Sequence, residues 1–287
     1  MIAETWALTV RELKKWVRTP ALVFIGIFQP IIWIALFGSA FNPSNLVPNS
    51  FGALQPSPEQ LNQIKQSILT QTFGGSPTYI TYLTGGMLCV LLLFTSAFSG
   101  GSLIWDRRFG FLNKLLASPI PRSSIFFSRV LSSVIKGLSQ SVLVFFIAIV
   151  VPNGLRLSPE FNTIDFIAVF FTLFLVAVGF SSLFTAMAVR VKKWETLIAV
   201  VNLLNLPLLF ASSALIPISS MPDWLQGIAK VNPISVGADV SRTLVVYGSL
   251  SPPQTTDVLF GMTYLLAFAV LTTFIGVMTS RLALKAE

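Results

Sequence analysis

Few side chains in this sequence are of types that perform covalent chemistry. The chain has no histidine and one cysteine, Cys89, which lies within an apolar run. A lone cysteine forms no intrachain disulfide, and zinc or haem sites of the usual kinds need more histidine and cysteine ligands than this. The sequence contains no Gly-x-x-x-x-Gly-Lys-Ser/Thr loop that could cradle the phosphates of ATP. We therefore predict no catalytic residue and no metal site.

A glycine-rich segment, SGGS at residues 99–102, superficially resembles a nucleotide-binding loop. It lies at the end of an apolar run, however, and its small residues are spaced four apart, as Ser96 with Gly100 and Ala97 with Gly101. This spacing lets helices approach closely within a membrane. We therefore favour helix packing over nucleotide binding for this segment.

Polar residues are rare inside the apolar runs. Gln29, Gln140, Asn202 and Asn205 are the deeper ones, and Lys136 lies about two turns into its run. Their ordinary role is hydrogen bonding between helices, and the alternative is contact with a substrate. Ion-coupled carriers generally need ionisable groups within the membrane, and these runs have almost none.

The elements that carry these residues have the composition of a membrane protein. Of the 287 residues, 54% are hydrophobic and 10% are charged, whereas a soluble domain has about 25% charged residues. Several charge-free runs exceed the roughly 20 residues that a helix needs to cross the hydrocarbon core. We predict an all-α polytopic membrane protein with six transmembrane helices, at about residues 21–41, 79–104, 130–151, 164–189, 197–218 and 258–280.

The basic residues alternate between the two sides of these spans. If the N-terminus is inside, only Lys65, Arg156, Lys230 and Arg242 of the nineteen basic residues fall on the outer side, which leaves fifteen on the cytoplasmic side. The positive-inside rule then places both termini in the cytoplasm. This distribution accounts for the net charge of +8 without nucleic acid, which we do not expect as a partner.

The chain begins with an amphipathic segment before the transmembrane domain of residues 21–285. In residues 1–20, Trp6, Val10, Leu13 and Val17 share one helical face with cations between them, the pattern of a cytoplasmic helix at the membrane interface. Such a helix either anchors the topology only or also braces the cytoplasmic face of the molecule.

Short helices are also predicted on the outer side. SPEQ at residues 57–60 has the form of a capping box with proline at the first helical position, and it precedes an apolar face of Leu61, Ile64, Ile68 and Leu69. Residues 219–257 contain two further helical stretches separated by Pro233. We expect these to be re-entrant or interfacial helices before the last span.

The connector after the second span, residues 105–129, is WDRRFGFLNKLLASPIPRSSIFFSR. Leu112, Leu115 and Leu116 give a short helix an apolar face, Lys114 lies opposite, and two prolines end the helix. An apolar face on a cytoplasmic connector either rests on the lipid interface or binds a partner, and we favour a partner.

This connector resembles the cytoplasmic coupling stretch of type 2 ABC exporter permeases, in which an acidic-then-basic pair, an apolar helix and a Ser-Pro-x-x-Arg turn precede the third span. The corresponding segments here are DRR at residues 106–108, FLNKLL at residues 111–116 and SPIPR at residues 118–122. The outer stretch before the last span is similar to the same family, especially its drug-resistance and nodulation-factor branch. Its matching residues are IP at 216–217, MPDWL at 221–225, NP at 232–233, Asp239 and Arg242.

The resemblance implies a permease subunit of an ATP-driven exporter, itself not an enzyme, in the plasma membrane or in the inner membrane of a Gram-negative-type bacterium. It implies two ABC ATPase subunits as partners, with ATP and Mg²⁺ bound there and no cofactor in this chain. It also implies a second permease copy, identical or different, and an amphipathic, lipid-linked, drug-like or polysaccharide substrate.

Two sets of site residues follow. The ATPase-coupling residues implied by the resemblance are Asp106, Arg107, Arg108, Leu112, Leu115, Leu116, Pro119 and Arg122. The candidate pathway-lining residues are Gln29, Asn202 and Asn205. The main alternative function is an ATP-independent carrier or channel. A membrane-embedded transferase is disfavoured, because no carboxylates or histidines cluster in the sequence.

Overall fold

The computed structural model describes residues 1–40, 75–151 and 154–283, together with residues 57, 59, 60, 63, 67 and 73. Within these residues the regular structure is entirely helical, which confirms the predicted all-α class. The helices are α1 (Ile2–Val17), α2 (Pro20–Ala40), α4 (Tyr79–Ala97), α5 (Gly101–Arg108), α6 (Phe111–Ala117), α7 (Arg122–Val150), α8 (Thr163–Arg190), α9 (Trp194–Phe210), α10 (Asp223–Lys230), α11 (Pro233–Tyr247) and α12 (Pro252–Ala283), with a 3₁₀ turn η2 (Ile218–Ser220).

Four helical stretches in the described residues are long and apolar enough to cross a membrane: α4 with α5, α7, α8 and α12. The two remaining predicted spans correspond to shorter apolar helices, Val23–Leu36 within α2 and α9. Local signals start several of these helices. Asn162 and Asp165 form a capping box at the start of α8, and the side chain of Asn232 caps α11 ahead of Pro233.

Two predicted spans differ from the structure. The second span is interrupted, because α4 ends at Ala97 and α5 begins at Gly101. The fifth span was expected to reach residue 218, but α9 ends at Phe210. There the Asn232 side chain donates hydrogen bonds of 2.7 Å to the carbonyls of Leu208 and Ala211. These bonds satisfy carbonyls that a continuing helix would have used, so the chain turns back.

The centre of the bundle is held by close helix contacts at glycines. A Cβ on Gly179 of α8 would lie 2.4 Å from the Phe268 ring of α12, and one on Gly276 would lie 2.3 Å from Phe126 of α7. Gly100 faces Ala188 and Thr185 of α8 in the same way, which confirms that the SGGS segment serves helix packing. The opposite face of α12 exposes apolar side chains such as Phe260 and Phe274, as expected for contact with lipid.

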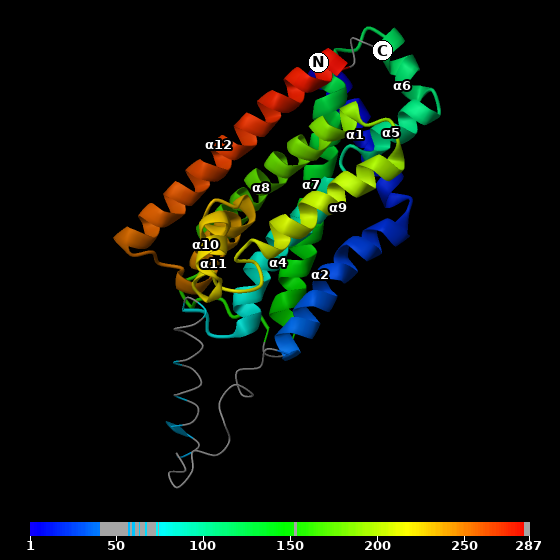
Figure 1. Ribbon diagram of the computed structural model, residues 1–287. Helices are drawn as coiled ribbons and strands as arrows, with labels where there is room; N and C mark the ends of the chain where they lie inside the picture. The colour runs from blue at the N-terminus through cyan, green and yellow to red at the C-terminus, as the bar shows by residue number, and fades with distance from the viewer. Residues whose placement is uncertain are drawn as a thin grey trace.

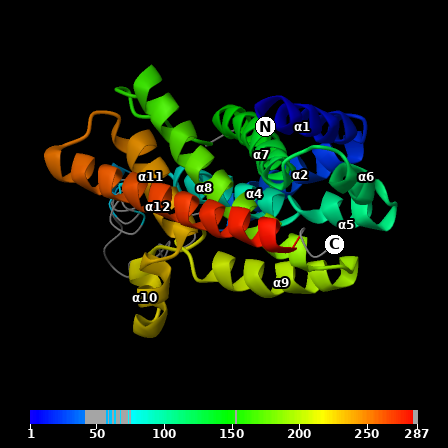
Figure 2. The ribbon, with the colours of Figure 1, turned by 90° about the horizontal axis from the view of Figure 1, so that it is seen from above.

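The start of α1 and the end of α12 lie at the same end of the bundle as α5 and α6 (Figure 1). Figure 2 shows α1 on one side of the bundle and α9 on the other, with α4 and α5 between them. Helix α1 buries Leu8, Thr9 and Glu12, and Leu8 packs in a second apolar cluster with Leu103, Leu112, Leu115, Ile125 and Val189. The helix therefore braces this end of the molecule, and Trp6 and Val17 are exposed; their contact with the membrane interface stays a prediction.

Two short helices precede the last span, as predicted. Trp224 and Ile228 of α10 are exposed, whereas α11 is buried in the bundle through Ile234 and Ala238. The predicted capping box is also present, since the backbone amide of Ser57 donates to the Gln60 side chain and that of Gln60 to the Ser57 hydroxyl. The apolar face expected to follow it, Leu61, Ile64, Ile68 and Leu69, lies outside the described residues.

Candidate functional site

A cavity of about 530 Å³ opens between α1, α2, α4, α5, α7 and the start of α9. Most of its wall is apolar and aromatic, and it includes four of the six tryptophans, Trp16, Trp33, Trp105 and Trp194. Its volume falls within the range of small-molecule sites, which are about 300–1,000 Å³ and mostly apolar with a few polar groups. The cavity is therefore suited to a ligand with a large apolar part.

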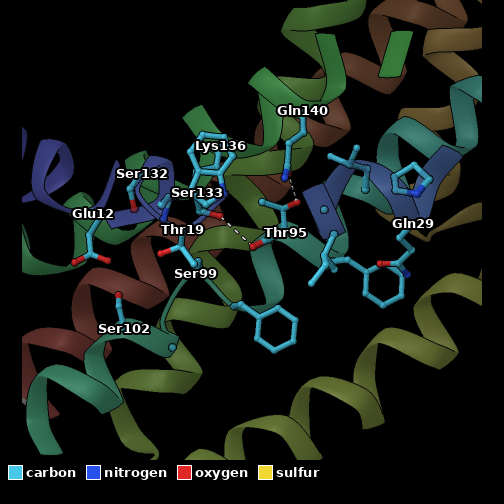
Figure 3. Close-up of a pocket in the computed structure, with 18 of the residues that line it drawn as sticks. Glu12, Thr19, Gln29, Thr95, Ser99, Ser102, Ser132, Ser133, Lys136 and Gln140 are labelled. Atoms are coloured by element: carbon cyan, nitrogen blue, oxygen red, sulfur yellow. Dashed lines mark hydrogen bonds between the residues drawn. The ribbon is translucent and has the colours of Figure 1, made fainter. Parts of the chain in front are cut away.

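Four of the polar groups of the cavity come from one face of α7. Ser132 and Ser133 are adjacent, and Lys136 and Gln140 follow at intervals of three or four residues, so they line up along that helix. The Gln140 side chain accepts a hydrogen bond of 3.0 Å from Thr95 of α4. Figure 3 shows Glu12, Ser102 and Ser132 toward one end of the cavity and Gln29 and Gln140 toward the other. The cavity thus has a charged end and a neutral polar end.

The charged end is closed by an ion-pair cluster of Arg11, Glu12, Lys15, Asp106 and Arg129. Arg129 is fully buried, and its guanidinium reaches Glu12 at 2.5 Å and Asp106 at 2.6 Å. Arg11 makes a bidentate pair with Asp106, with distances of 3.0 and 2.8 Å. Lys15 lies 3.1 Å from Glu12. The cluster ties α1 to α5 and α7, so these three helices meet at one electrostatic centre.

The cluster changes the acid–base properties of α1. Burial by itself raises the pKa of the Glu12 carboxyl, but the charges and hydrogen bonds of Arg129 and Lys15 outweigh it and hold that pKa below its ordinary value. The hydrogen bond to Asp106 raises the pKa of the Arg11 guanidinium. Glu12 is therefore ionised at neutral pH, and it is compensated by cations.

Lys136 has a different environment from these cations. It is half-buried, lines the cavity, and makes no hydrogen bond or ion pair within the part of the chain that the structure describes. Lys15 also lines the cavity, but it is paired with Glu12 and Asp106. Among the described residues, Lys136 is therefore the lining cation that makes no direct hydrogen bond or ion pair, and Glu12 acts on it only through electrostatic attraction.

Of the predicted pathway-lining residues, the structure brings only Gln29 to the cavity. Asn202 is exposed on α9, and Asn205 is buried with neither amide atom hydrogen-bonded among the described residues. The three residues therefore do not share one site within this chain, and the role of the two asparagines in a pathway stays a prediction.

The predicted coupling residues fall into two groups. Arg108 and Pro119 are exposed, and Leu116 and Arg122 are half-buried. Asp106 belongs to the ion-pair cluster, and Arg107 donates hydrogen bonds of 2.9 and 3.1 Å to the carbonyls of Val191 and Val189. Arg108 and Pro119 thus face outward, Leu116 packs partly against the apolar cluster of Leu8, Leu112 and Leu115, and Asp106 and Arg107 fix α5 to its neighbours.

The expectation that the leucine face of α6 binds a partner is wrong for two of its three leucines. Leu112 is 0% exposed and Leu115 is 7% exposed, because both pack inside the chain with Leu8 of α1, Ile125 of α7 and Val189. The exposed residues of this segment are instead Trp105, Arg108, Phe109, Asn113, Lys114, Ala117, Pro119 and Pro121.

Comparison with known proteins identifies the family. The ABC-2 type transporter family matches residues 3–246. The chain belongs to this family.

The chain is also similar to individual transport proteins. It is 33% identical over 250 residues to a Cyanophora paradoxa protein named as a transport permease, ycf38, covering 86% of this chain and 76% of that protein. It is 24% identical over 261 residues to a Mycobacterium tuberculosis protein named as the doxorubicin resistance ABC transporter permease DrrC, covering 88% and 80%. A Streptomyces coeruleorubidus protein named the daunorubicin resistance ABC transporter permease DrrB1 is 24% identical over 185 residues, covering 62% and 63%.

Membership in the ABC-2 family confirms the resemblance found in the sequence and makes the chain a membrane component of a transporter. Sequence reasoning missed most of the cavity of this ABC-2 permease, although one signal was available. Arg129, the Ser132–Ser133 pair, Lys136 and Gln140 follow one another at intervals of three or four residues along a mainly apolar segment. Such a stripe indicates a polar face turned toward the protein interior.

Proposed function

We propose that this permease is the membrane subunit of an ATP-driven exporter whose ATP hydrolysis takes place on a separate polypeptide. Two permeases, identical or different, pair in the plasma membrane with their termini in the cytoplasm and bind two ATPase subunits. Family membership supports a transport role, and the sequence has no phosphate-cradling loop of its own. The relatives named for doxorubicin and daunorubicin resistance support an amphipathic substrate.

The observation that carries the proposal is an outward surface on α5 and α6, formed by Arg108, Phe109, Asn113, Lys114 and Pro119, which we call the α5–α6 surface. Phe109 is 75% exposed, and large exposed aromatic side chains with nearby cations are typical of protein interfaces. The surface lies at the end of the bundle that carries the chain termini (Figure 1). This position supports a role for the surface in binding a cytoplasmic partner.

The same surface is firmly connected to the cavity. Leu112 and Leu115 anchor it from beneath, and Arg107 holds α5 to the connection between α8 and α9. Helix α5 itself contributes Gly101, Ser102 and Trp105 to the cavity wall. A movement imposed on the α5–α6 surface when the ATPases bind ATP would thus be transmitted to the cavity and tilt α2, α4 and α9 around the pathway.

A binding experiment tests the proposal. Phe109→Ala with Lys114→Glu is expected to weaken capture of the ABC ATPase that co-purifies with the wild-type chain. Burial of a phenylalanine contributes about 1.5–3 kcal/mol, which corresponds to at least about a tenfold loss. The matched control is Trp224→Ala, which removes an aromatic side chain of similar exposure, 71%, on α10.

The controls and contrary outcomes are direct. Correct insertion of the double variant is checked by adding Lys192→Cys, an exposed position between α8 and α9 that should label only after the cells are opened. Undiminished ATPase capture by an inserted Phe109 and Lys114 double variant would contradict the coupling surface. Gradient-driven flux through the purified chain without any ATPase would favour the carrier or channel instead.

A further inference from the structure

We propose that the cavity selects amphipathic anions, and that the ammonium group of Lys136 recognises the negative head of the bound molecule. The inference rests on the proposed function in one respect, since it takes this cavity as a substrate site. It goes further by naming the charge of the substrate and the residue that recognises this charge.

The first argument is the contrast between Lys136 and the other buried cations. Arg129 meets two carboxylates, Arg107 donates to two carbonyls, and Arg242 donates to carbonyls and to Asp239. Lys136 sits midway along α7 and has no such partner in the described part of the chain. A cation held within a membrane span without a counter-charge is costly, and such groups generally serve a substrate or ion. An anionic ligand would bring the direct ion-pair partner that Lys136 lacks.

The second argument is the charge balance around the cavity. The ion-pair cluster has two carboxylates, Glu12 and Asp106, against three cations, Arg11, Lys15 and Arg129. Both carboxylates already bind these cations directly, so neither forms an ion pair with Lys136, which Glu12 attracts while Arg129 and Lys15 repel it. The wall therefore carries excess positive charge, which attracts an anion and disfavours a cation.

The third argument is that the polar and apolar parts of the cavity are arranged for one amphipathic molecule. Around Lys136, the α7 face supplies Ser132, Ser133 and Gln140 as additional hydrogen-bonding groups (Figure 3). Gly26 of α2 lets the Gln140 amide pack closely against that helix, because a Cβ there would lie 2.1 Å from the amide nitrogen. The remaining wall, rich in tryptophan and phenylalanine, fits an acyl chain or an aromatic body.

An anionic lipid of the bilayer and an anionic cargo from the cytoplasm share this chemistry. The experiment separates them through the tryptophans, because bromine atoms quench indole fluorescence on contact and four tryptophans line the cavity. The isolated permease is placed in nanodiscs of zwitterionic phosphatidylcholine. It is titrated with dibromododecyl phosphate, with the neutral dibromododecanol, or by exchange with a brominated anionic phosphatidylglycerol.

We expect quenching by the alkyl phosphate to saturate at lower concentration than quenching by the alcohol. Lys136→Gln should weaken alkyl phosphate binding by about tenfold to a hundredfold, as expected for loss of a charge-assisted contact, and leave the alcohol unchanged. Lys136→Arg keeps the charge and should retain the preference. Lys192→Gln, which removes an exposed lysine between α8 and α9, is the matched control and should behave as wild type.

The outcomes distinguish this inference from the proposed function. The anion site would be overturned by equal quenching from the alkyl phosphate and the alcohol, or by an unchanged preference in a folded Lys136→Gln protein. Either result would count against the site whether or not the chain binds an ATPase. A Lys136-dependent preference in a chain that binds no ATPase would support the site and contradict the exporter. Preference for the phosphatidylglycerol alone identifies a lipid ligand, and preference for the added alkyl phosphate identifies a cargo; either requires Lys136.

Discussion

Two buried arginines hold opposite parts of this permease, and their partners differ in kind. Arg129 lies beside the cavity and is matched by the carboxylates of Glu12 and Asp106 on two other helices. Arg242 of α11 donates instead to backbone carbonyls, at 2.7 Å to Tyr82, 2.7 Å to Ser213 and 3.1 Å to Ala214. Arg129 therefore joins helices through ion pairs, whereas Arg242 mainly donates hydrogen bonds to backbone carbonyls, two of them in the non-helical segment after α9.

The difference follows from what each part of the chain must do. Residues 211–217 follow the end of α9 without forming a helix, so their carbonyls need donors, and Arg242 supplies several from one rigid fork. Its carboxylate partner, Asp239, is half exposed to solvent. The ion-pair cluster, in contrast, is made of groups whose charges depend on one another. The cavity end is therefore held mainly by pairs of opposite charges, and the α11 end mainly by hydrogen bonds from Arg242 to backbone carbonyls.

The largest effect in this comparison is expected for Arg129→Met. The substitution leaves Glu12 and Asp106 buried with less positive charge, and breaking a buried pair in this way costs about 3–5 kcal/mol. Thermal unfolding followed with a thiol-reactive dye measures it, since the single cysteine, Cys89, is completely buried. Below the transition, α1 should become sensitive to trypsin while Cys89 stays protected. A melting temperature close to that of the wild type would show that the cluster does not hold this end.

A smaller and differently placed effect is expected for Arg242→Met. The carbonyls of Tyr82, Ser213 and Ala214 lose their donor, and an unsatisfied buried polar group costs about 1–3 kcal/mol. Helix α11 covers Cys89, because a Cβ on Gly237 would lie 3.1 Å from its sulfur. Dye labelling of Cys89 below the transition should therefore rise in this variant, without increased cleavage of α1. Labelling equal to that of Arg129→Met would remove the distinction between the two ends.

The sequence was sufficient for the features that depend on neighbouring residues. The long apolar runs predicted the helices, because an apolar segment of that length must satisfy its backbone internally. The Ser57 and Gln60 capping box could be predicted for the same reason, since its residues lie three apart. Helix α9, however, ends where Asn232 binds Leu208 and Ala211, and those contacts join residues more than twenty positions apart.

The candidate site was harder to predict because its parts meet only in the folded chain. Amphipathicity correctly gave α6 an apolar face, but it could not show that Leu8 and Val189 cover Leu112 and Leu115 from within the chain. The pairing of Glu12 with Arg129 was equally invisible, since both residues counted only as charges at the membrane interface. The stripe along α7 is the exception, because its spacing alone indicates a polar interior face.

The smallest expected effect is a difference in pH dependence between α1, at the cavity end, and α11, at the other end. Because the pKa of Glu12 is lower in the folded protein than its ordinary value of about 4.3, its ionised form stabilises the fold. That contribution is complete above the ordinary pKa and is lost as the pH falls through the lower, folded-state pKa.

Hydrogen exchange, corrected for the intrinsic effect of pH, measures this loss. It should show α1 opening in acid, and Glu12→Gln should show much of this opening already at neutral pH. The corrected exchange rate of residues 233–247 should change less over the same range, because Arg242 binds three carbonyls, which do not titrate, and its one carboxylate partner, Asp239, is half exposed. If α11 opened in acid over the same pH range as α1, the two ends would form one cooperative unit. The ion-pair cluster and the Arg242 contacts would then not stabilise separate parts of the molecule.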